Sequence, residues 1–455
     1  MSHRAGIPLR AEDALFLHAQ SPRLCQQVGA VLLLEPAAAL DISALRAVIT
    51  ERVRAIPTLR HRLEPASGRW RRPRWVADEG DIGPRIREVR CGQDGNPRTL
   101  AGIVDTFFSL ECDPYRRPWE VWLIPGAPDG RTAVAVKIHH ALGDSHAIIA
   151  ALTKLLDPTA EGPARRVATG QNAASGRQLP GNDGSRDAVG VAVRGAAARL
   201  QDGLRAVRGL SHLAAAGAAP DVSVCGPFTG GRRRYVQAVL PAWEVARTAR
   251  GLDTQIADLL LAVTAEALGR LLRSRGEETA GQVVRIAVPR ACPVRGRGRA
   301  PGTEPRNRTA AVTLDAPIGP ASPAQRLAAV RGQVAARVHR GDAAAAAMVL
   351  RVMNFLPLPL QRLAAVQFYQ RRWFNLLVSV FPGARRSYAL LGARVEEAYP
   401  VLALADGAGL AIGAMTWERS MAVGILADAG LVPDVDKLAA EIPAAFELYR
   451  AAAQA

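Results

Sequence analysis

A long stretch without large apolar residues divides the sequence and constrains how the chain can fold. Residues 157–190 read DPTAEGPARRVATGQNAASGRQLPGNDGSRDAVG, which is rich in Gly, Pro, Ser, Asn and Asp. We expect a flexible linker there, because so little apolar surface cannot offset the entropy lost on ordering. Val, Leu and Ala at helical spacing in 191–217 predict a crossover helix. A chain of 455 residues can form a domain on each side, which gives an N-terminal domain at 1–156, a linker with crossover helix at 157–220 and a C-terminal domain at 221–455.

Helix and strand signals alternate in the N-terminal part. Apolar positions recur at helical spacing in 11–20 and 41–54, and Asp41 or Ser43 can cap the second helix. The apolar run at 28–36 predicts a strand between them. Basic loops with Gly and Pro are expected next, followed by two strands, WEVWLIPG and RTAVAVKIHH, joined by the turn residues APDG. These signals predict a mixed α/β domain.

The C-terminal part repeats this alternation. QIADLLLAVTAEALGRLLRSRG has apolar residues three and four positions apart, with Thr254 as a candidate cap and Gly276 as a stop signal. Further helices are predicted at 322–339, 343–370 and 434–450, and strands at 283–289, 309–315, 374–381, 409–417 and 421–426. The predicted fold class is therefore α/β (α+β), with mixed sheets in two domains.

Cysteine spacing and the N-terminus are typical of a cytoplasmic protein. The five cysteines form no C-x-x-C pair and have no close histidine partner, so no zinc site is predicted: Cys25, Cys91, Cys112, Cys225 and Cys292. The opening MSHRAGIPLRAEDALFLHAQSP carries Arg, Glu and Asp where a signal peptide needs an apolar core. No apolar run reaches the length of about 18 residues that a membrane span requires.

The strongly basic charge is a second constraint on partners. The formal charge is +17, with basic runs RWRRPRW, GRRRY and VRGRGR, a pattern that can indicate nucleic-acid binding. Only three of the 58 basic residues are lysines, however, and the runs are dispersed among globular segments, which indicates an Arg- and Ala-rich compositional bias. We therefore expect no nucleic acid as a partner, and favour anionic lipid headgroups or a phosphorylated cofactor.

The stretch 343–370, AAAAAMVLRVMNFLPLPLQRLAAVQFYQ, is more hydrophobic than its surroundings. One interpretation is a core helix pair broken at Pro357 and Pro359. The other is an apolar lip that touches a bilayer or a lipid acceptor. A lip of this kind predicts peripheral contact with an anionic membrane, at its inner face, or with lipid droplets.

Two histidines follow a predicted strand in KIHHALGDSHAI, residues 137–148. Asp144 or Ser145 can cap the next helix, which places the histidines at a strand end before a helix N-terminus. An imidazole there can act as a general base in acyl transfer. Because neighbouring strand residues point to opposite sides, only one of His139 and His140 can face a given cleft. A structural histidine and a metal site are the alternatives, although no further ligand follows at metal-binding spacing.

HHALGDS resembles the HHxxxDG motif of bacterial wax ester synthase/acyl-CoA:diacylglycerol acyltransferases, which belong to the coenzyme A-dependent acyltransferase superfamily. The resemblance extends over nearly the whole chain. The segments that follow the family's order and spacing are PLRAEDALFLHAQSP, DPYRRPWEVWLIPG with Arg116, Trp119 and Glu120, GPFTGGRRRY, ADLLLAVTAEALGRLL, RNRTAAV, SVFPG, LLGARVEEAYPV, LADGAGL and LVPDVDKLA. A series of this length indicates a divergent member of the family.

The resemblance implies two chloramphenicol-acetyltransferase-like domains, joined by a long linker, with a tunnel between them. Acyl-CoA, a co-substrate rather than a bound cofactor, would enter from one side, and a long-chain alcohol or diacylglycerol from the other. His140 would be the general base, His139 would support the fold, and Asp144 would hold the loop through an arginine. The implied substrate-binding residues are Ser145, Asp258, Asn307, Ser379, Trp119 and Arg116. Basic residues in and near GGRRRYVQAV are candidates for the CoA phosphates, but a solvated loop is the favoured interpretation.

Four positions depart from the family's pattern. Ser145 stands where the motif has glycine, and Ala257, Val380 and Ala411 stand where the family has asparagine. A lost amide removes a potential donor to an oxyanion, and a β-carbon obstructs close approach of backbone to substrate. The sequence thus predicts an acyl-CoA-dependent O-acyltransferase that makes triacylglycerol or wax ester. The alternatives are a catalytically weak or inactive paralogue that binds acyl-CoA or lipid, and a condensation-type reaction on a carrier-bound or glycolipid substrate.

Overall fold

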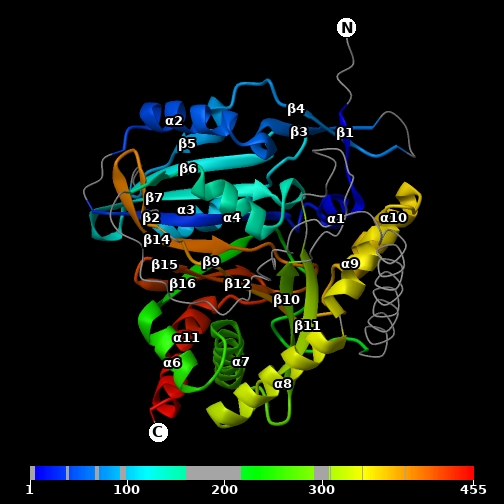
Figure 1. Cartoon of the computed structure of the whole chain (residues 1–455), viewed down its shortest axis with the longest axis vertical. Helices are drawn as coiled ribbons and strands as arrows, with labels where there is room; N and C mark the ends of the chain where they lie inside the picture. The colour runs from blue at the N-terminus through cyan, green and yellow to red at the C-terminus, as the bar shows by residue number, and fades with distance from the viewer. Residues whose placement is uncertain are drawn as a thin grey trace, which may run out of the picture.

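The computed structural model describes residues 6–36, 40–66, 71–92, 99–159, 217–291, 307, 309–340, 342–384 and 386–454. Most of the predicted linker and nearly all of the predicted crossover helix lie outside these residues. The described chain is built around two large mixed sheets with helices on their outer faces (Figure 1).

The first large sheet has seven strands and combines both halves of the chain. Its order is β5 (Ile86–Glu88), β6 (Trp119–Ala127), β7 (Arg131–His139), β2 (Gln27–Leu34), β14 (Ala393–Val401), β13 (Tyr388–Leu390) and β8 (Asp157–Pro158). All eight residues of β2 are buried, as expected of a strand covered on both faces. α2 (Ile42–Arg54) turns Leu45, Ile49 and Val53 inward at helical spacing, and α1 (Ala11–Ala19), α3 (Leu100–Ser109) and α4 (Ser145–Thr153) complete this half.

The second large sheet has six strands, all from the C-terminal half. Its order is β11 (Thr309–Pro317), β10 (Val283–Ala291), β12 (Leu376–Phe381), β15 (Leu410–Trp417), β16 (Ser420–Asp428) and β9 (Arg233–Pro241). β12 runs parallel to β10 and β15, and the other pairs are antiparallel. The helices of this half are α6 (Ala242–Gly251), α7 (Ile256–Ser274), α8 (Pro323–Arg340), α9 (Asp342–Met353), α10 (Leu358–Phe368) and α11 (Val435–Ala452).

The two sheets pack against each other through β14. This strand, orange in Figure 1, pairs with β2 in the first sheet and packs against β15 and β16 of the second. Close approach requires glycine, because a Cβ at Gly424 would lie 2.2 Å from the carbonyl oxygen of Pro400. Residues from the predicted C-terminal domain therefore complete the sheet that carries the N-terminal strands.

A small sheet and the helices α9 and α10 lie at the edge of the two-sheet core. The small sheet has the order β1 (Ile7–Pro8), β4 (Arg74–Ala77) and β3 (His61–Glu64). α10 runs beside α1, as Figure 1 shows, and Met353 of α9 and Ala365 of α10 form a buried cluster with Ala11. Both helices are thus docked on the helix that leads into the first large sheet.

Several local predictions need correction. Loops were expected between α2 and β6, but β3, β4, β5 and α3 form there, because residues such as Leu63, Trp75, Ile86 and Phe107 are buried in the shared core. The basic run GGRRRY enters β9 rather than forming a solvated loop. Thr254 does not cap α7: its hydroxyl is buried without a hydrogen-bond partner among the described residues, and Gln255 holds the cap position. Asp41, rather than Ser43, caps α2 by accepting from the Ala44 amide at 2.8 Å.

Membrane-spanning helices, disulfides and metal clusters are absent from the described residues. None of the helices there is both long and apolar enough to cross a membrane. No cluster of three or more His, Cys, Asp or Glu side chains within that part of the chain could hold a metal ion. Cys25, Cys91, Cys112 and Cys225 are free thiols, and Cys292 lies outside the described ranges.

Candidate functional site

The HHALGDS segment is fixed at the end of β7 by backbone hydrogen bonds. The amide of His139 donates to the Pro118 carbonyl and that of His140 to the Gln26 carbonyl, each at 2.8 Å. His140 begins a 3₁₀ turn, and α4 follows, capped by Asp144, whose Oδ1 accepts from the Ala147 amide at 2.9 Å. His139 is the last residue of β7 and His140 is the first residue of the turn. Strand alternation alone therefore does not determine how the two side chains are oriented.

His139 is completely buried, and both of its ring nitrogens are hydrogen-bonded to other residues of the protein. Its side chain has no exposed surface. Nδ1 accepts from the Ala141 amide at 3.1 Å, so the ring proton is on Nε2, which donates to Oε1 of Gln20 at 2.6 Å. Burial, with the neighbouring His140, lowers the pKa of His139 to about 3. His139 is therefore neutral, and its supporting role stays a prediction from the resemblance.

His140 lies in a polar network whose hydrogen-bond directions can be deduced. The Nδ2 amide of Asn307 faces two acceptors, Oδ1 of Asp13 and the His140 carbonyl, both at 3.0 Å. This fixes the orientation of the Asn307 amide, whose Oδ1 is 3.0 Å from Nδ1 of His140 and must accept a proton from it. The neutral ring therefore carries its proton on Nδ1, which leaves Nε2 as the nitrogen with a free lone pair.

The surroundings of His140 keep it in this neutral form. The Phe16 ring stacks on the imidazole with centroids 3.6 Å apart and an angle of 11° between the planes. Burial lowers the pKa of His140 below the usual value, and hydrogen bonds to the backbone at positions 140 and 143, the Asp144 carboxylate and the Asn307 hydrogen bond oppose this shift. A neutral imidazole with one defined lone pair can accept a proton from a substrate hydroxyl.

The other predicted site residues are spread over several elements. Ser145 is the first residue of α4. Asp258 is buried in the first turn of α7; burial raises its pKa, and its Oδ1 has no hydrogen-bond partner among the described residues. Ser379 is buried on β12. No described hydrogen bond joins Asp258 or Ser379 to His140, whereas Asn307 contacts it directly. The arginine contact of Asp144 and the tunnel also stay predictions.

Trp119 and Arg116 occupy different environments. Trp119 is buried, its indole donates to the Leu59 carbonyl at 2.9 Å, and the Arg85 guanidinium lies over its ring. These contacts hold β6 in place. Arg116 is exposed and lines a surface hollow of about 530 Å³ together with Arg62, Tyr115 and Arg117.

The predicted CoA-phosphate candidates near GGRRRYVQAV are largely paired with carboxylates. Arg233 is buried and contacts Asp428 at 2.7 Å, and its guanidinium lies over the Phe228 ring. Arg234 forms ion pairs with Asp105 and Asp436. Neither guanidinium is therefore an unoccupied phosphate ligand.

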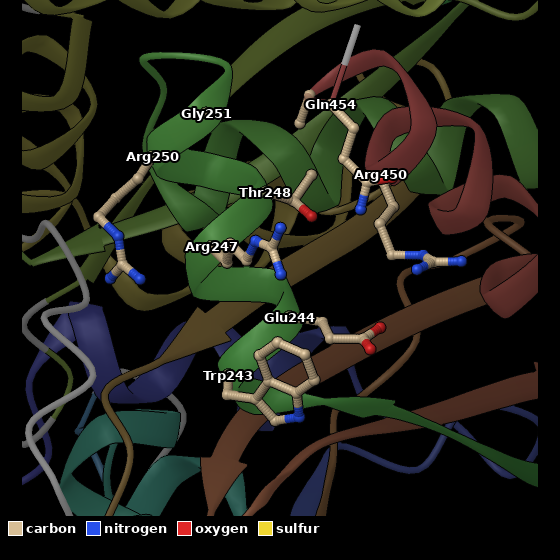
Figure 2. Close-up of a pocket in the computed structure, with 9 residues that line it drawn as sticks. Trp243, Glu244, Arg247, Thr248, Arg250, Gly251, Arg450 and Gln454 are labelled. Atoms are coloured by element: carbon tan, nitrogen blue, oxygen red, sulfur yellow. The ribbon is translucent and has the colours of Figure 1, made fainter.

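A second hollow lies between α6 and the C-terminal end of α11. It has a volume of about 330 Å³, and Figure 2 shows Trp243, Glu244, Arg247 and Thr248 on one side with Arg450 and Gln454 on the other. None of its lining residues belongs to the His140 network. Its lining includes an acidic side chain, Glu244, as well as arginines.

Asn307 was predicted as a site residue, but the α1 residues that support His140 and Asn307 were not identified from the sequence. Asp13 and Phe16 share one face of α1, three positions apart, and Tyr369, which follows α10, lies edge-on to Phe16 with centroids 5.6 Å apart. The available signal was an acidic residue within the apolar pattern EDALFLH. That pattern does not reveal which distant residue the carboxylate meets.

Because His139 is buried in its neutral form, we expect the free energy of unfolding to depend on pH. In the unfolded chain His139 should titrate near 6.5, whereas its pKa in the fold is about 3. Between these values the unfolded state binds the proton, so the free energy of unfolding should fall by up to about 1.4 kcal/mol per pH unit as the pH drops from about 6.5 toward 3. Urea unfolding between pH 7 and 4 should show a shallower dependence for His139→Gln than for the unmodified protein. Equal slopes would contradict the buried neutral state.

Comparison with known proteins gives matches over both halves. Residues 9–260 match the family model of the wax ester synthase/diacylglycerol acyltransferase catalytic domain, and residues 306–450 match that of the WS/DGAT C-terminal domain. A probable diacylglycerol O-acyltransferase of Mycobacterium tuberculosis H37Rv is 27% identical over 434 residues, covering 94% of this chain and 92% of the relative. A putative diacylglycerol O-acyltransferase of the same strain is 28% identical, covering 96% and 88%.

Solved structures share the fold. The wax ester synthase/diacylglycerol acyltransferase from Marinobacter aquaeolei VT8 superposes with a TM-score of 0.66 at 20% identity, covering 99% of this chain and all of that one. The first condensation domain of the CDA synthetase gives a TM-score of 0.60 at 16% identity, covering 99% and 97%. These likenesses confirm the predicted fold class of mixed sheets in a two-domain, chloramphenicol-acetyltransferase-like architecture.

Proposed function

Because the chain belongs to the wax ester synthase/diacylglycerol acyltransferase family, we propose that it is an acyl-CoA-dependent O-acyltransferase with His140 as general base. The acceptor would be a lipid hydroxyl, from diacylglycerol or a long-chain alcohol, and the product triacylglycerol or wax ester. The observation that carries the proposal is the Nδ1–H tautomer of His140, which leaves Nε2 ready to accept a proton.

The proposed reaction needs no covalent enzyme intermediate. Nε2 of His140 takes the proton of the acceptor hydroxyl as its oxygen attacks the thioester carbonyl carbon. The tetrahedral intermediate then collapses, the carbon–sulfur bond breaks, and the imidazolium returns its proton to the CoA thiolate. Ester and free CoA thiol are the products, and the histidine ends the cycle neutral.

An acceptor-dependence assay tests the function. The purified protein is given palmitoyl-CoA with hexadecanol, with diacylglycerol or without acceptor, while free thiol and ester are measured separately. We expect thiol and ester to form in equal amounts, and only when a hydroxyl acceptor is present. Binding of palmitoyl-CoA without any product, with either acceptor, would refute the proposed enzyme activity.

Binding of palmitoyl-CoA without product would instead support the alternative of a catalytically weak or inactive paralogue that binds acyl-CoA or lipid. The departures Ala257, Val380 and Ala411 favour it, because each lacks an amide donor found in the family. Ala411 is buried on β15, and its side chain has no donor to take the place of that amide. The intact hydrogen bonds of His140 favour the active enzyme.

We further propose that the α9–α10 segment, residues 342–368, contacts an anionic lipid surface. Its buried side packs on α1, so the predicted core helix pair and the predicted lip describe opposite sides of this segment. The lip, defined here by its exposed apolar side chains, consists of Val352, Phe355, Leu360, Leu363 and Val366, which are 45 to 88% exposed. From 343 to 368 the sequence has two arginines and no acidic residue, as expected for a surface that meets anionic headgroups.

The segment that carries the lip packs against α1, whose Phe16 contacts His140. Asn354, in the turn between α9 and α10, accepts from the Ala11 amide at 2.9 Å and donates to Glu12 at 2.8 Å. At the other end of α10, Tyr369 contacts Phe16, which stacks on His140. These contacts join the lip-bearing segment to the proposed base through α1.

A further inference from the structure

Three side chains from distant segments form a buried chain of hydrogen bonds. Asp13 on α1, Asn307 and His140 are each at most 8% exposed. Oδ1 of Asp13 accepts from both the amide nitrogen and Nδ2 of Asn307, at 2.9 and 3.0 Å. Asn307 cannot rotate its amide without placing its oxygen against that carboxylate. Its Oδ1 is thereby held against Nδ1 of His140.

We propose that Asp13, acting through Asn307, is a positioning residue that selects the Nδ1–H tautomer of His140 and stabilises the imidazolium formed during acyl transfer. This inference rests on the proposed function of His140. When Nε2 takes the acceptor proton, positive charge appears on the ring, and Nδ1–H donates more strongly to Asn307. The negative charge of Asp13 polarises the Asn307 amide in the direction that favours this change.

An intervening amide has a different effect from a carboxylate placed directly on the ring. A carboxylate in contact would raise the pKa of His140, so that the ring would be protonated up to a higher pH and would act as a base only above it. The amide provides the same orientation while leaving the ring neutral. Phe16 covers one face of the imidazole and limits its rotation, which adds to the positioning.

Other titratable groups near His140 must be separated from Asp13 in any test. Asp144 and His139 face it from its own segment, and Tyr369 approaches from the end of α10 through Phe16. Burial raises the pKa of Tyr369, so this phenol is neutral across the working range. Asp144 is retained in every variant below, and its contribution is therefore constant.

The test exchanges the carboxylate and the amide. Asp13→Asn, Asn307→Asp and the double exchange are compared with the unmodified protein in pH profiles of kcat and kcat/KM for palmitoyl-CoA and hexadecanol. Asp13→Asn should lower kcat about tenfold or more with little change in KM, and should move the acid limb to lower pH. The double exchange should recover most of the lost kcat at high pH and move the acid limb to higher pH, because the carboxylate then contacts the ring.

Glu12→Gln is the matched control, since Glu12 is the neighbouring buried carboxylate on α1 but bonds Asn354 instead of Asn307. It should leave the acid limb in place. The proposal would be overturned if the acid limb of the kcat profile were the same in all variants and activity were lost only in proportion to the fraction unfolded. Asp13 would then have a purely structural role.

A second readout does not depend on activity. Nitrogen NMR shifts of the labelled imidazole should report Nδ1–H for His140 in the unmodified protein and a mixture of tautomers in Asp13→Asn. If acyl transfer is absent but this tautomer preference is found, the proposed function fails while the positioning by Asp13 stands. An Nε2–H tautomer in the unmodified protein would refute the positioning itself.

Discussion

His140→Ala is expected to lower kcat by about 10²- to 10⁴-fold, the usual contribution of a positioned general base. The variant removes the nitrogen that would accept the proton of the acceptor hydroxyl, and it leaves Asn307 bonded to Asp13 and to the backbone carbonyl at position 140. Because the lost nitrogen would act in proton transfer rather than in binding of the thioester, KM for palmitoyl-CoA should change little. Thiol release and ester formation are measured in parallel over single and multiple turnovers.

The interpretation of this result depends on the fold of the variant. Phe16 loses its stacking partner, so the melting temperature and palmitoyl-CoA binding must be measured on the same preparation. Loss of kcat with binding retained supports the general base. Acceptor-dependent thiol release at an undiminished rate would rule out His140 as the base, and a loss of binding together with kcat would instead indicate a collapsed site.

Replacing two residues of the lip, Phe355→Asp with Leu363→Asp, should weaken binding to anionic vesicles by about a hundredfold or more. Their side chains are 88 and 58% exposed, so the native fold does not depend on burying them. Each large apolar side chain contributes about 1.5–3 kcal/mol when it is fully transferred from water, and two acidic charges add repulsion from the headgroups. Co-sedimentation with phosphatidylglycerol vesicles gives the partition coefficient.

Trp243→Asp is the control for the lip variant. Trp243 is 57% exposed, but it lies on α6 beside the hollow of Figure 2 and is not part of the α9–α10 segment. Its replacement should leave vesicle binding unchanged. The lip variant should also keep its rate with a short-chain, water-soluble alcohol, since the His140 network is intact. Equal vesicle binding by all three proteins would exclude the lip as the lipid-contact surface.

Local patterns predicted much of the fold. The helices around 41–54 and 434–450 and the strands that became β6, β7 and β15 follow apolar periodicity, and Pro357 separates α9 from α10 as expected of a residue without an amide donor. Among the elements missed, β5 has only three residues and β9 begins with two arginines, whereas α3 has an apolar pattern that was overlooked. Burial in a shared core stabilises these segments, and local sequence carries little trace of it.

The sequence by itself determined the family, the mixed two-domain fold and the two histidines at the end of a strand, because these depend on residues close together in the chain. Only the tertiary structure decided which nitrogen of His140 is free. That choice depends on Asp13 and Asn307, which are 294 residues apart in the chain and become hydrogen-bonded only in the packed fold. A buried carboxylate must find a donor, and the packing of α1 beside the 3₁₀ turn at His140 determined that this donor is the amide that orients the proposed base.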